Sequence, residues 1–237
     1  MERTGRCRPA ISAFSLFACL SLSGAVSAKS VAPNDFHHTV LGTFDMHVCN
    51  WPERAPFLVA VFATHRAQDI ARIEVLRPDG RRLGDIPLVR FELRSDQYGE
   101  RQVFKTHLPL EKGAATGWYR ARLHARDGGV IEARDYVDIK IMPQVRALQR
   151  RASELRWQPL AGAAHYRVIV KDPWQDKKIV YKSDLLREPR LQLPLGSLEP
   201  NGDYVWQVHA RDTARAVKWG EFNHGSLSPE APLAPNS

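Results

Sequence analysis

His47 and Cys49 are the pair of residues best suited to metal chemistry. They lie two positions apart in the segment HHTVLGTFDMHVCN, so on a β-strand both side chains point to the same face. A thiolate and an imidazole are ligands that copper and zinc favour. Two ligands do not complete a metal site, and His37 and His38 lie too far up the chain to be placed beside them. We therefore expect a half-buried Cys49 on an edge strand next to a surface histidine, with a His47–Cys49 metal site as the alternative.

Carboxylates are the second group that could do chemistry. The segment RDYVD places Asp135 and Asp138 three positions apart, and at that spacing two strand residues face opposite sides of a sheet. This is poor geometry for an acid–base pair, so we interpret them as solvated or turn carboxylates. The sequence also lacks the Gly-x-Ser-x-Gly, His-Glu-x-x-His, phosphate-loop and dinucleotide-binding motifs. We expect no catalytic residue and no cofactor.

Three tryptophans are candidates for binding through exposed aromatic rings. Trp51 lies between Asn and Pro, Trp174 lies in the turn-rich segment DPWQDKK, and Trp219 precedes a glycine. Exposed tryptophan side chains can carry protein or sugar binding. The alternative is that these rings cover the ends of a β-sandwich. Trp51, Trp174 and Trp219 are therefore predicted as binding residues, with a purely structural role left open.

The first residues predict export. MERTGRCR is basic, PAISAFSLFACLSLSGAV is uncharged and mostly apolar, and VSA offers small residues for cleavage. This order is typical of a secretory signal peptide, here residues 1–28, removed before Lys29. The segment LFAC also resembles a lipobox loosely, which would place a lipid anchor on Cys19. After cleavage of the signal peptide we expect no membrane span.

The net charge indicates which class of partner to expect, and the cysteine content indicates what holds the fold together. Removal of residues 1–28 takes away three Arg and one Glu and lowers the formal net charge from +8 to +6. In an exported protein this favours an envelope protein or an anionic polysaccharide over nucleic acid. Cys49 then remains as a single cysteine, so the fold depends on its hydrophobic core, and Cys49 is free or bonded to another molecule.

The segments that must position these residues are short strands. From about residue 35 to residue 142, runs of alternating apolar and polar residues are separated by Gly, Pro, Asn and Asp, as in RPDGRR and RDGG. This pattern is typical of an all-β sandwich of the immunoglobulin-like kind. The run FLVAVF, residues 57–62, has no polar alternation and predicts a central strand. No Cys…Trp…Cys pattern is present, so the family of this half stays open.

An internal repeat indicates a second sandwich. LPLEKGAATGWYRARLHARD (residues 108–127) and LPLGSLEPNGDYVWQVHARD (residues 193–212) align without gaps, with nine of twenty positions identical. Each segment reads as the end of one strand, a crossing loop and the next strand. In those strands Tyr119, Tyr204 and Trp206 share the core-facing alternation. Duplication of a sandwich is one explanation, and convergence on a common loop–strand unit is the other.

The segment LRWQPLAGAAHYRVIV (residues 155–170), followed by LEPNGDYVWQVHARD, resembles a fibronectin type III domain of bacterial envelope proteins. The resemblance covers residues 147–227 and implies a second β-sandwich. It makes Trp157 the core tryptophan, Tyr166 the tyrosine that opens the next strand, and Tyr204 the tyrosine-corner residue. Residues 228–237 are expected to be a disordered tail.

These features together predict an all-β protein with two tandem immunoglobulin-like or fibronectin type III-like sandwiches. A fold of this kind does not define a function. We expect an exported, non-enzymatic binding or structural spacer protein of the cell envelope, periplasmic or secreted. The alternatives are a carbohydrate- or anionic-polymer-binding module and an accessory subunit of an envelope enzyme or secretion complex.

Overall fold

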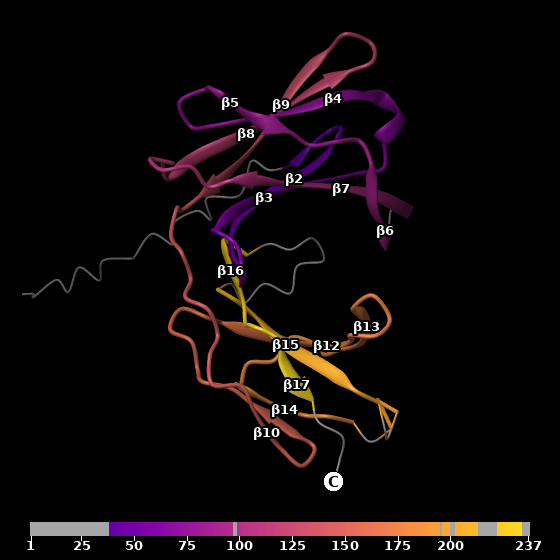
Figure 1. Cartoon of the computed structure of the whole chain (residues 1–237). Coiled ribbons are helices and arrows are strands. Elements are labelled where there is room, and N and C mark those ends of the chain that lie inside the picture. The colour runs from indigo at the N-terminus through magenta and orange to yellow at the C-terminus, as the bar shows by residue number, and fades with distance from the viewer. Residues whose placement is uncertain (1–37, 97–98, 195, 200–201, 213–221, 234–237) are drawn as a thin grey trace, which may run out of the picture. The chain divides into compact units, whose positions relative to one another are not determined.

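The computed structural model describes residues 38–96, 99–194, 196–199, 202–212 and 222–233 (Figure 1). The expected signal peptide, Cys19 and Trp219 lie outside these ranges. In the described ranges, regular structure consists of β-strands and one 3-10 turn at Ala67–Asp69. No helix in this part of the chain is long and apolar enough to cross a membrane. The predicted fold class, all-β with two successive sandwiches, is confirmed.

The first sandwich consists of two layers. Its strands are β1 (His38–Thr39), β2 (Gly42–Asn50), β3 (Phe57–Thr64), β4 (Ile70–Leu76), β5 (Arg82–Asp85), β6 (Arg90–Asp96), β7 (Gly99–Pro109), β8 (Gly117–Ala125) and β9 (Val130–Val137). One layer has the order β2-β3-β7-β6, with β1 beside β2, and the other has the order β5-β4-β8-β9. Figure 1 shows β4, β5 and β8 as a layer over β2, β3 and β7.

The core of this sandwich follows the alternation of its strands. Phe44 and Met46 on β2, Phe62 on β3, Ile73 on β4 and Tyr119 on β8 are fully buried between the two layers. Strand β3 is buried at every residue, as the unbroken run FLVAVF predicts, because it lies between β2 and β7 and both of its faces are covered. Its second face contributes to a separate apolar cluster described below.

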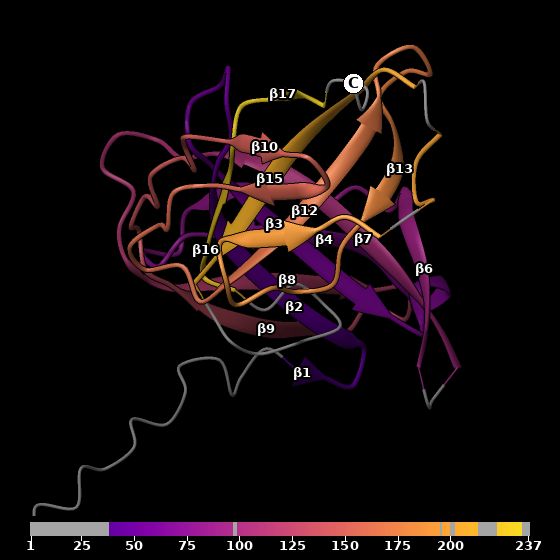
Figure 2. The same ribbon diagram turned by 90° about the horizontal axis from the view of Figure 1, so that it is seen from below.

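The second sandwich has a three-stranded layer and a larger sheet. Its strands are β10 (Gln149–Arg151), β11 (Glu154–Arg156), β12 (His165–Asp172), β13 (Lys178–Lys182), β14 (Arg190–Gln192), β15 (Tyr204–Arg211), β16 (His224–Leu227) and β17 (Ala231–Leu233). The small layer has the order β10-β11-β14, and the larger sheet contains β13-β12-β15, with β16 and β17 both beside β15. Figure 2 shows β12 and β13 side by side.

The fibronectin-like residues lie in the second core. Trp157 is 4% exposed, and its ring centroid lies 5.4 Å from that of Tyr166 and 6.4 Å from that of Trp206. The Tyr166 hydroxyl accepts a hydrogen bond from the Leu160 N–H, across the turn that separates the two strands. Residues 155–170 therefore form a turn that brings two large rings together in one core.

The repeated segments form equivalent corners. The Tyr119 hydroxyl donates to the Ala115 carbonyl at 3.1 Å, and the Tyr204 hydroxyl accepts from the Glu199 N–H at 3.3 Å. Each tyrosine lies at the start of its strand, and the backbone partner lies in the loop just before it. Tyr119 is fully buried, whereas Tyr204 is half-buried.

Strand β16 joins the two sandwiches into one sheet. It pairs antiparallel with β15 and parallel with β2, placing His224 opposite Val48 and Gly225 opposite Cys49. The ten-stranded sheet of the described residues therefore runs through both halves. We define its outer face as the face opposite the one packed against the two cores.

The prediction of a disordered tail is wrong for residues 228–233. Ser228 is fully buried, and its hydroxyl accepts a hydrogen bond from the Val208 N–H. Residues 231–233 form β17, which pairs with Tyr204–Trp206, and Leu233 enters the second core. Pro232 lies within β17, and proline is tolerated in an edge strand because one side of its backbone is unpaired. The sandwich therefore extends beyond the expected boundary at residue 227.

Candidate functional site

The register of the sheet places a set of polar side chains on its outer face. Across β2, β3 and β7, Asp45 is opposite Val61 and then Lys105, and His47 is opposite Val59 and then His107. Directly opposite residues of a sheet point to the same face and lie next to one another. These two rows form one side of a recess of about 170 Å³.

A third row crosses from the first half of the chain to the second. Cys49 on β2 is opposite Gly225 on β16, which is opposite Arg211 on β15. Gly225 has no side chain, and a Cβ atom there would lie 2.5 Å from the Phe222 ring and 2.9 Å from the His209 ring nitrogen Nε2. The glycine thus makes room for both rings. Phe222 packs with Cys49 in the apolar cluster that forms the floor of the recess.

The prediction that His47 lies at the surface and that Cys49 is half-buried on an edge strand is wrong. Cys49 is 1% exposed and His47 is 5% exposed, because β2 is an inner strand between β3 and β16 and the Phe222 ring stacks 4.1 Å from the His47 ring. His47 Nδ1 lies 3.2 Å from Asp45 Oδ2. Burial lowers the pKa of His47, but hydrogen bonds to the Asp45 and Cys49 side chains and the charges of both groups raise it more, to about 9.

The predicted His47–Cys49 pair does come together, as the strand spacing required. In the described ranges, no group of three or more His, Cys, Asp and Glu side chains is placed to hold a metal ion. The arrangement is instead a buried line of carboxylate, imidazole and thiol along one face of β2. Its immediate effect is to hold a positive charge on His47 at the floor of the recess.

Basic side chains surround the recess. Arg94, Lys105 and Arg211 line it, and Arg167 on β12 and Lys182 on β13 lie on the same face of the sheet. Burial lowers the pKa of Lys105 and also that of Arg211, to about 10, and repulsion from the nearby guanidinium of Arg167 adds to the effect on Arg211. The cations are therefore close enough to destabilise one another's charge.

Several nitrogen atoms around the recess are buried without a hydrogen-bond partner. They are Trp51 Nε1, Arg167 Nε, His209 Nε2 and Arg211 Nε. The Arg211 guanidinium lies 4.7 Å from the centroid of the Phe222 ring. A buried polar group that lacks a partner costs free energy, so a cluster of such nitrogens in one place favours an acceptor group that comes from outside the described chain.

Few of these cations form an ion pair with a carboxylate, although the charges of Asp184 and Glu92 act on some of them. Arg94 pairs with Glu92 at 2.8 Å, and Asp45 is occupied by His47. Within the described ranges, Lys105, Arg167, Lys182 and Arg211 form no ion pair with a carboxylate. None of these four residues stands out in the sequence as a candidate binding residue. The signal was present as basic residues at outward-facing positions of successive strands, but recognising it requires knowing which strands are neighbours.

The predicted binding tryptophans are in different places. Trp51 is half-buried at the edge of the recess, with its ring edge-on to Phe57 at 5.0 Å and to His107 at 5.5 Å. The Trp174 side chain is 81% exposed in the β12–β13 turn, where the backbone N–H of Trp174 donates to the Asp172 carboxylate. Trp51 therefore belongs to the recess and Trp174 does not.

The interpretation of Asp135 as a solvated or turn carboxylate is wrong. Asp135 is 1% exposed, and its Oδ2 accepts a hydrogen bond from the Met46 N–H at 2.7 Å. This carboxyl group binds the edge of β2 beside the β16 pairing. Burial and the charge of Asp45 raise the pKa of Asp135 well above the usual range. Asp138 is exposed and accepts from the Thr116 hydroxyl, so the two carboxyls form no acid–base pair.

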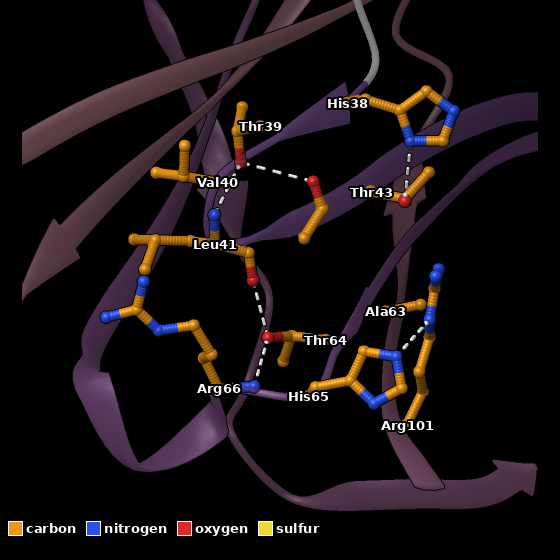
Figure 3. A pocket seen from close by; sticks show the side chains of 11 residues that line it. His38, Thr39, Val40, Leu41, Thr43, Ala63, Thr64, His65, Arg66 and Arg101 are labelled. Carbon is orange, nitrogen blue, oxygen red and sulfur yellow. Dashed lines mark hydrogen bonds between the residues drawn. The ribbon is translucent and has the colours of Figure 1, made fainter. Parts of the chain in front are cut away.

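A second recess lies at the β1–β2 turn, and its polar groups bind one another (Figure 3). The Thr64 hydroxyl donates to the Leu41 carbonyl and accepts from the Arg66 N–H. Arg101 Nε donates to His65 Nε2 at 2.8 Å. These groups form hydrogen bonds with one another. The second recess therefore differs from the first, where buried nitrogen atoms lack a hydrogen-bond partner.

Comparisons with known proteins give no family for this chain. No protein-family model and no curated protein matches it. The solved structure of Dpr11 IG1 bound to DIP-gamma IG+IG2 is similar at 12% identity and a TM-score of 0.24, covering 82% of this chain and 98% of that one. DIP-gamma IG1+IG2 is similar at 11% identity and a TM-score of 0.25, covering 81% and 95%. At this level the likeness carries no functional argument, and we base the function on the chain's own residues.

Proposed function

We propose that this chain is an exported, non-enzymatic binding protein of the cell envelope that binds an acidic partner at the recess. One observation carries the proposal: basic side chains outnumber carboxylates around a recess whose buried nitrogens lack hydrogen-bond partners. Hydrogen bonds between charged groups are about twice as strong as neutral ones. An acidic ligand would supply both the missing acceptors and the missing negative charge.

The face of the sheet is a better binding surface than its edges. The edge strands of the ten-stranded sheet are β6 and β13. Each carries a register shift, at Arg90/Glu92 in β6 and opposite Val170/Lys171 in β13, and β13 begins and ends with lysine. Bulges and charged residues are devices that prevent a further strand from pairing with an edge. The outer face of the sheet and the loops beside it are therefore the surfaces available for binding.

An anionic polysaccharide is the partner that fits this face best. Trp51 offers an aromatic ring beside Lys105 and Arg211, all within the lining of one recess. Aromatic and arginine side chains are enriched among the residues that contribute most of the binding free energy of an interface. An acidic envelope protein would use the same groups. Periplasmic or secreted localisation rests on the charge and apolar pattern of residues 1–28.

A structural spacer is the second candidate. It is favoured by the pairing of β16 with β2, which connects the two halves through backbone hydrogen bonds as well as through the linker. A role as accessory subunit would use the same acidic-partner site.

The test is a binding titration of residues 29–237 with polygalacturonate, an anionic polysaccharide, and with neutral dextran. We expect saturable binding to the first and none to the second. The variants Lys105→Gln and Arg211→Gln should each weaken binding about tenfold or more, the usual effect of losing a charge-assisted hydrogen bond of about 1.5–3 kcal/mol. Lys112→Gln, at an exposed turn position, is the matched control. Equal weakening by the control, or equal binding of dextran, would refute the proposed site.

A further inference from the structure

Arg167 and Arg211 flank one imidazole on the outer face. Arg167 is directly opposite His209 in the β12–β15 pairing, and Arg211 lies two residues further along β15. Residues two apart on a strand share a face, so both guanidinium groups project from the same side of the sheet, next to His209. This places the two fork-shaped donors with unpartnered Nε atoms on adjacent strands.

Other positive charges lie around this pair. Burial lowers the pKa of Lys182 and that of Arg167. The charge of Arg167 adds to the effect on Lys182, and the charge of Arg94 adds to the effect on Arg167, whereas the charge of Asp184 opposes the effect on Arg167. His209 contributes no charge near neutrality, because burial and the charge of Arg211 hold its pKa well below the usual value. Guanidinium and ammonium groups therefore outnumber the nearby carboxylates, Asp184 and Glu92. In the described ranges, only Arg94 among them has a carboxylate ion pair, with Glu92.

We infer that the Arg167–Arg211 pair binds a phosphate monoester group of the acidic partner. The inference deepens the proposed function and rests on it, because it assigns the chemistry of the acidic group that the recess accepts. The guanidinium groups, the recess beside them and their unpartnered Nε atoms carry the assignment.

Charge and oxygen count favour a phosphate monoester over a carboxylate. A phosphate monoester carries close to two negative charges at pH 7 and three acceptor oxygens. A carboxylate carries one charge and two oxygens, so it can neutralise only one of several neighbouring cations. Arginine forks match phosphate oxygens in a bidentate manner. Two arginines on neighbouring strands, with Lys182 nearby, therefore fit a dianionic group with several oxygens.

Methyl phosphate is the probe that isolates this group. We expect residues 29–237 to bind methyl phosphate more tightly than acetate and to bind it about tenfold more weakly at pH 5 than at pH 7.5, because the second proton of a phosphate monoester leaves near pH 6. Acetate affinity should change little over this range. Excess methyl phosphate should also displace polygalacturonate from the protein.

Matched variants distinguish the contribution of the two arginines to phosphate binding from that of other basic residues. Arg167→Gln and Arg211→Gln should each reduce the affinity for methyl phosphate about tenfold or more, and Arg211→Lys should retain part of it. Both Gln variants should melt at or above the wild-type temperature, because each removes a partly buried positive charge from a cluster of cations. Lys112→Gln should bind as the wild type does.

The outcomes distinguish the two proposals. If polygalacturonate binds with dependence on Lys105 but methyl phosphate does not bind, the phosphate assignment is wrong and the acidic-partner function stands. If neither binds, both are wrong. Vesicles containing phosphatidic acid form a further arm: binding to them and to methyl phosphate indicates a lipid head group as the source. Binding to methyl phosphate with no binding to vesicles indicates a soluble or polymer-borne phosphate.

Discussion

His224 and Asp212 form a partly buried contact, with His224 Nδ1 2.6 Å from Asp212 Oδ2. The other ring nitrogen of His224 lies 2.8 Å from the backbone carbonyl of Asp138, in the first half of the chain. A carboxylate and a carbonyl both accept hydrogen bonds, so both ring nitrogens must donate and the ring must be protonated. Although burial lowers the pKa of His224, these hydrogen bonds raise it above the usual value.

The first prediction concerns the coupling of the two halves through this ring. His224→Gln can keep at most part of the bridge between Asp212 and Asp138, so the halves should unfold less cooperatively. Scanning calorimetry should show one transition for the wild type and a broadened or split transition for the variant. An unchanged single transition at the wild-type temperature would show that the bridge does not couple them.

The second prediction is a dependence of stability on pH through His47. Its pKa is raised in the folded chain, from 6.5 to about 9. The stabilisation is therefore fully present below pH 6.5 and is lost as the pH rises through 9. The free energy of unfolding should fall by a few kcal/mol across that interval, since each unit of pKa shift corresponds to about 1.4 kcal/mol.

Urea unfolding at pH 6 and pH 9 measures this effect. His47→Gln should flatten the dependence, whereas Lys112→Gln should leave it as in the wild type. A wild-type free energy of unfolding that is equal at both pH values would contradict the protonated His47 described above.

The third prediction concerns the buried carboxyl of Asp135. Because its pKa is raised on folding, ionisation favours the unfolded chain, and stability falls as the pH rises above the unfolded value of about 4. Asp135→Asn keeps an oxygen for the Met46 N–H and removes the ionisation. Thermal melts should show the variant more stable than the wild type at pH 8, and close to it at pH 4. Asp135→Ala, which loses the acceptor, should be less stable at both.

The fourth prediction compares two tryptophans in the second half. Trp157→Ala should cost about 3–5 kcal/mol, the usual range for an aromatic ring removed from a core. Trp174→Ala should change stability by no more than about 0.5 kcal/mol, as exposed substitutions generally do, because its side chain is 81% exposed. Denaturant unfolding of both variants provides the comparison. Greater damage from Trp174→Ala would mean that the two environments are assigned the wrong way round.

The fifth prediction tests β17. A chain that ends at residue 227 lacks the Ser228 hydrogen bonds and the Leu233 contact with the second core. It should melt at a lower temperature than a chain that ends at residue 233. A chain ending at residue 233 should match the full-length protein in the same measurement, and equal melting of all three would make β17 dispensable.

The sequence predicted the parts of this fold that depend on local pattern. Strand β12 begins beside Tyr166, the residue expected to open a strand, and the unbroken apolar run of β3 correctly indicated a central strand. The resemblance of residues 155–170 to a fibronectin type III domain implied the core positions of Trp157 and Tyr166, which the structure buries in one cluster. Features of this kind can be predicted from residues that are close in sequence and from the geometry of a β-strand.

The candidate site could be predicted only in part, because it depends on which strands become neighbours. The spacing of His47 and Cys49 correctly placed both on one face, but their burial depends on Phe222 and on β16, which come from the far end of the chain. Asp135 reads as a solvent-exposed residue until the edge of β2 is placed beside it. The grouping of Arg167 with Arg211 likewise follows from strand pairing and not from separation along the chain.

The parallel pairing of β16 with β2 has a consequence for how the chain folds. Val48 lies near the start of the described residues and His224 near their end, so β2 gains this neighbour only after almost all of the chain is available. Contacts between residues far apart in sequence slow folding, because a long loop must close before they form. The central sheet is therefore completed last, and β2 lacks its β16 neighbour until nearly the whole of the described chain has been made.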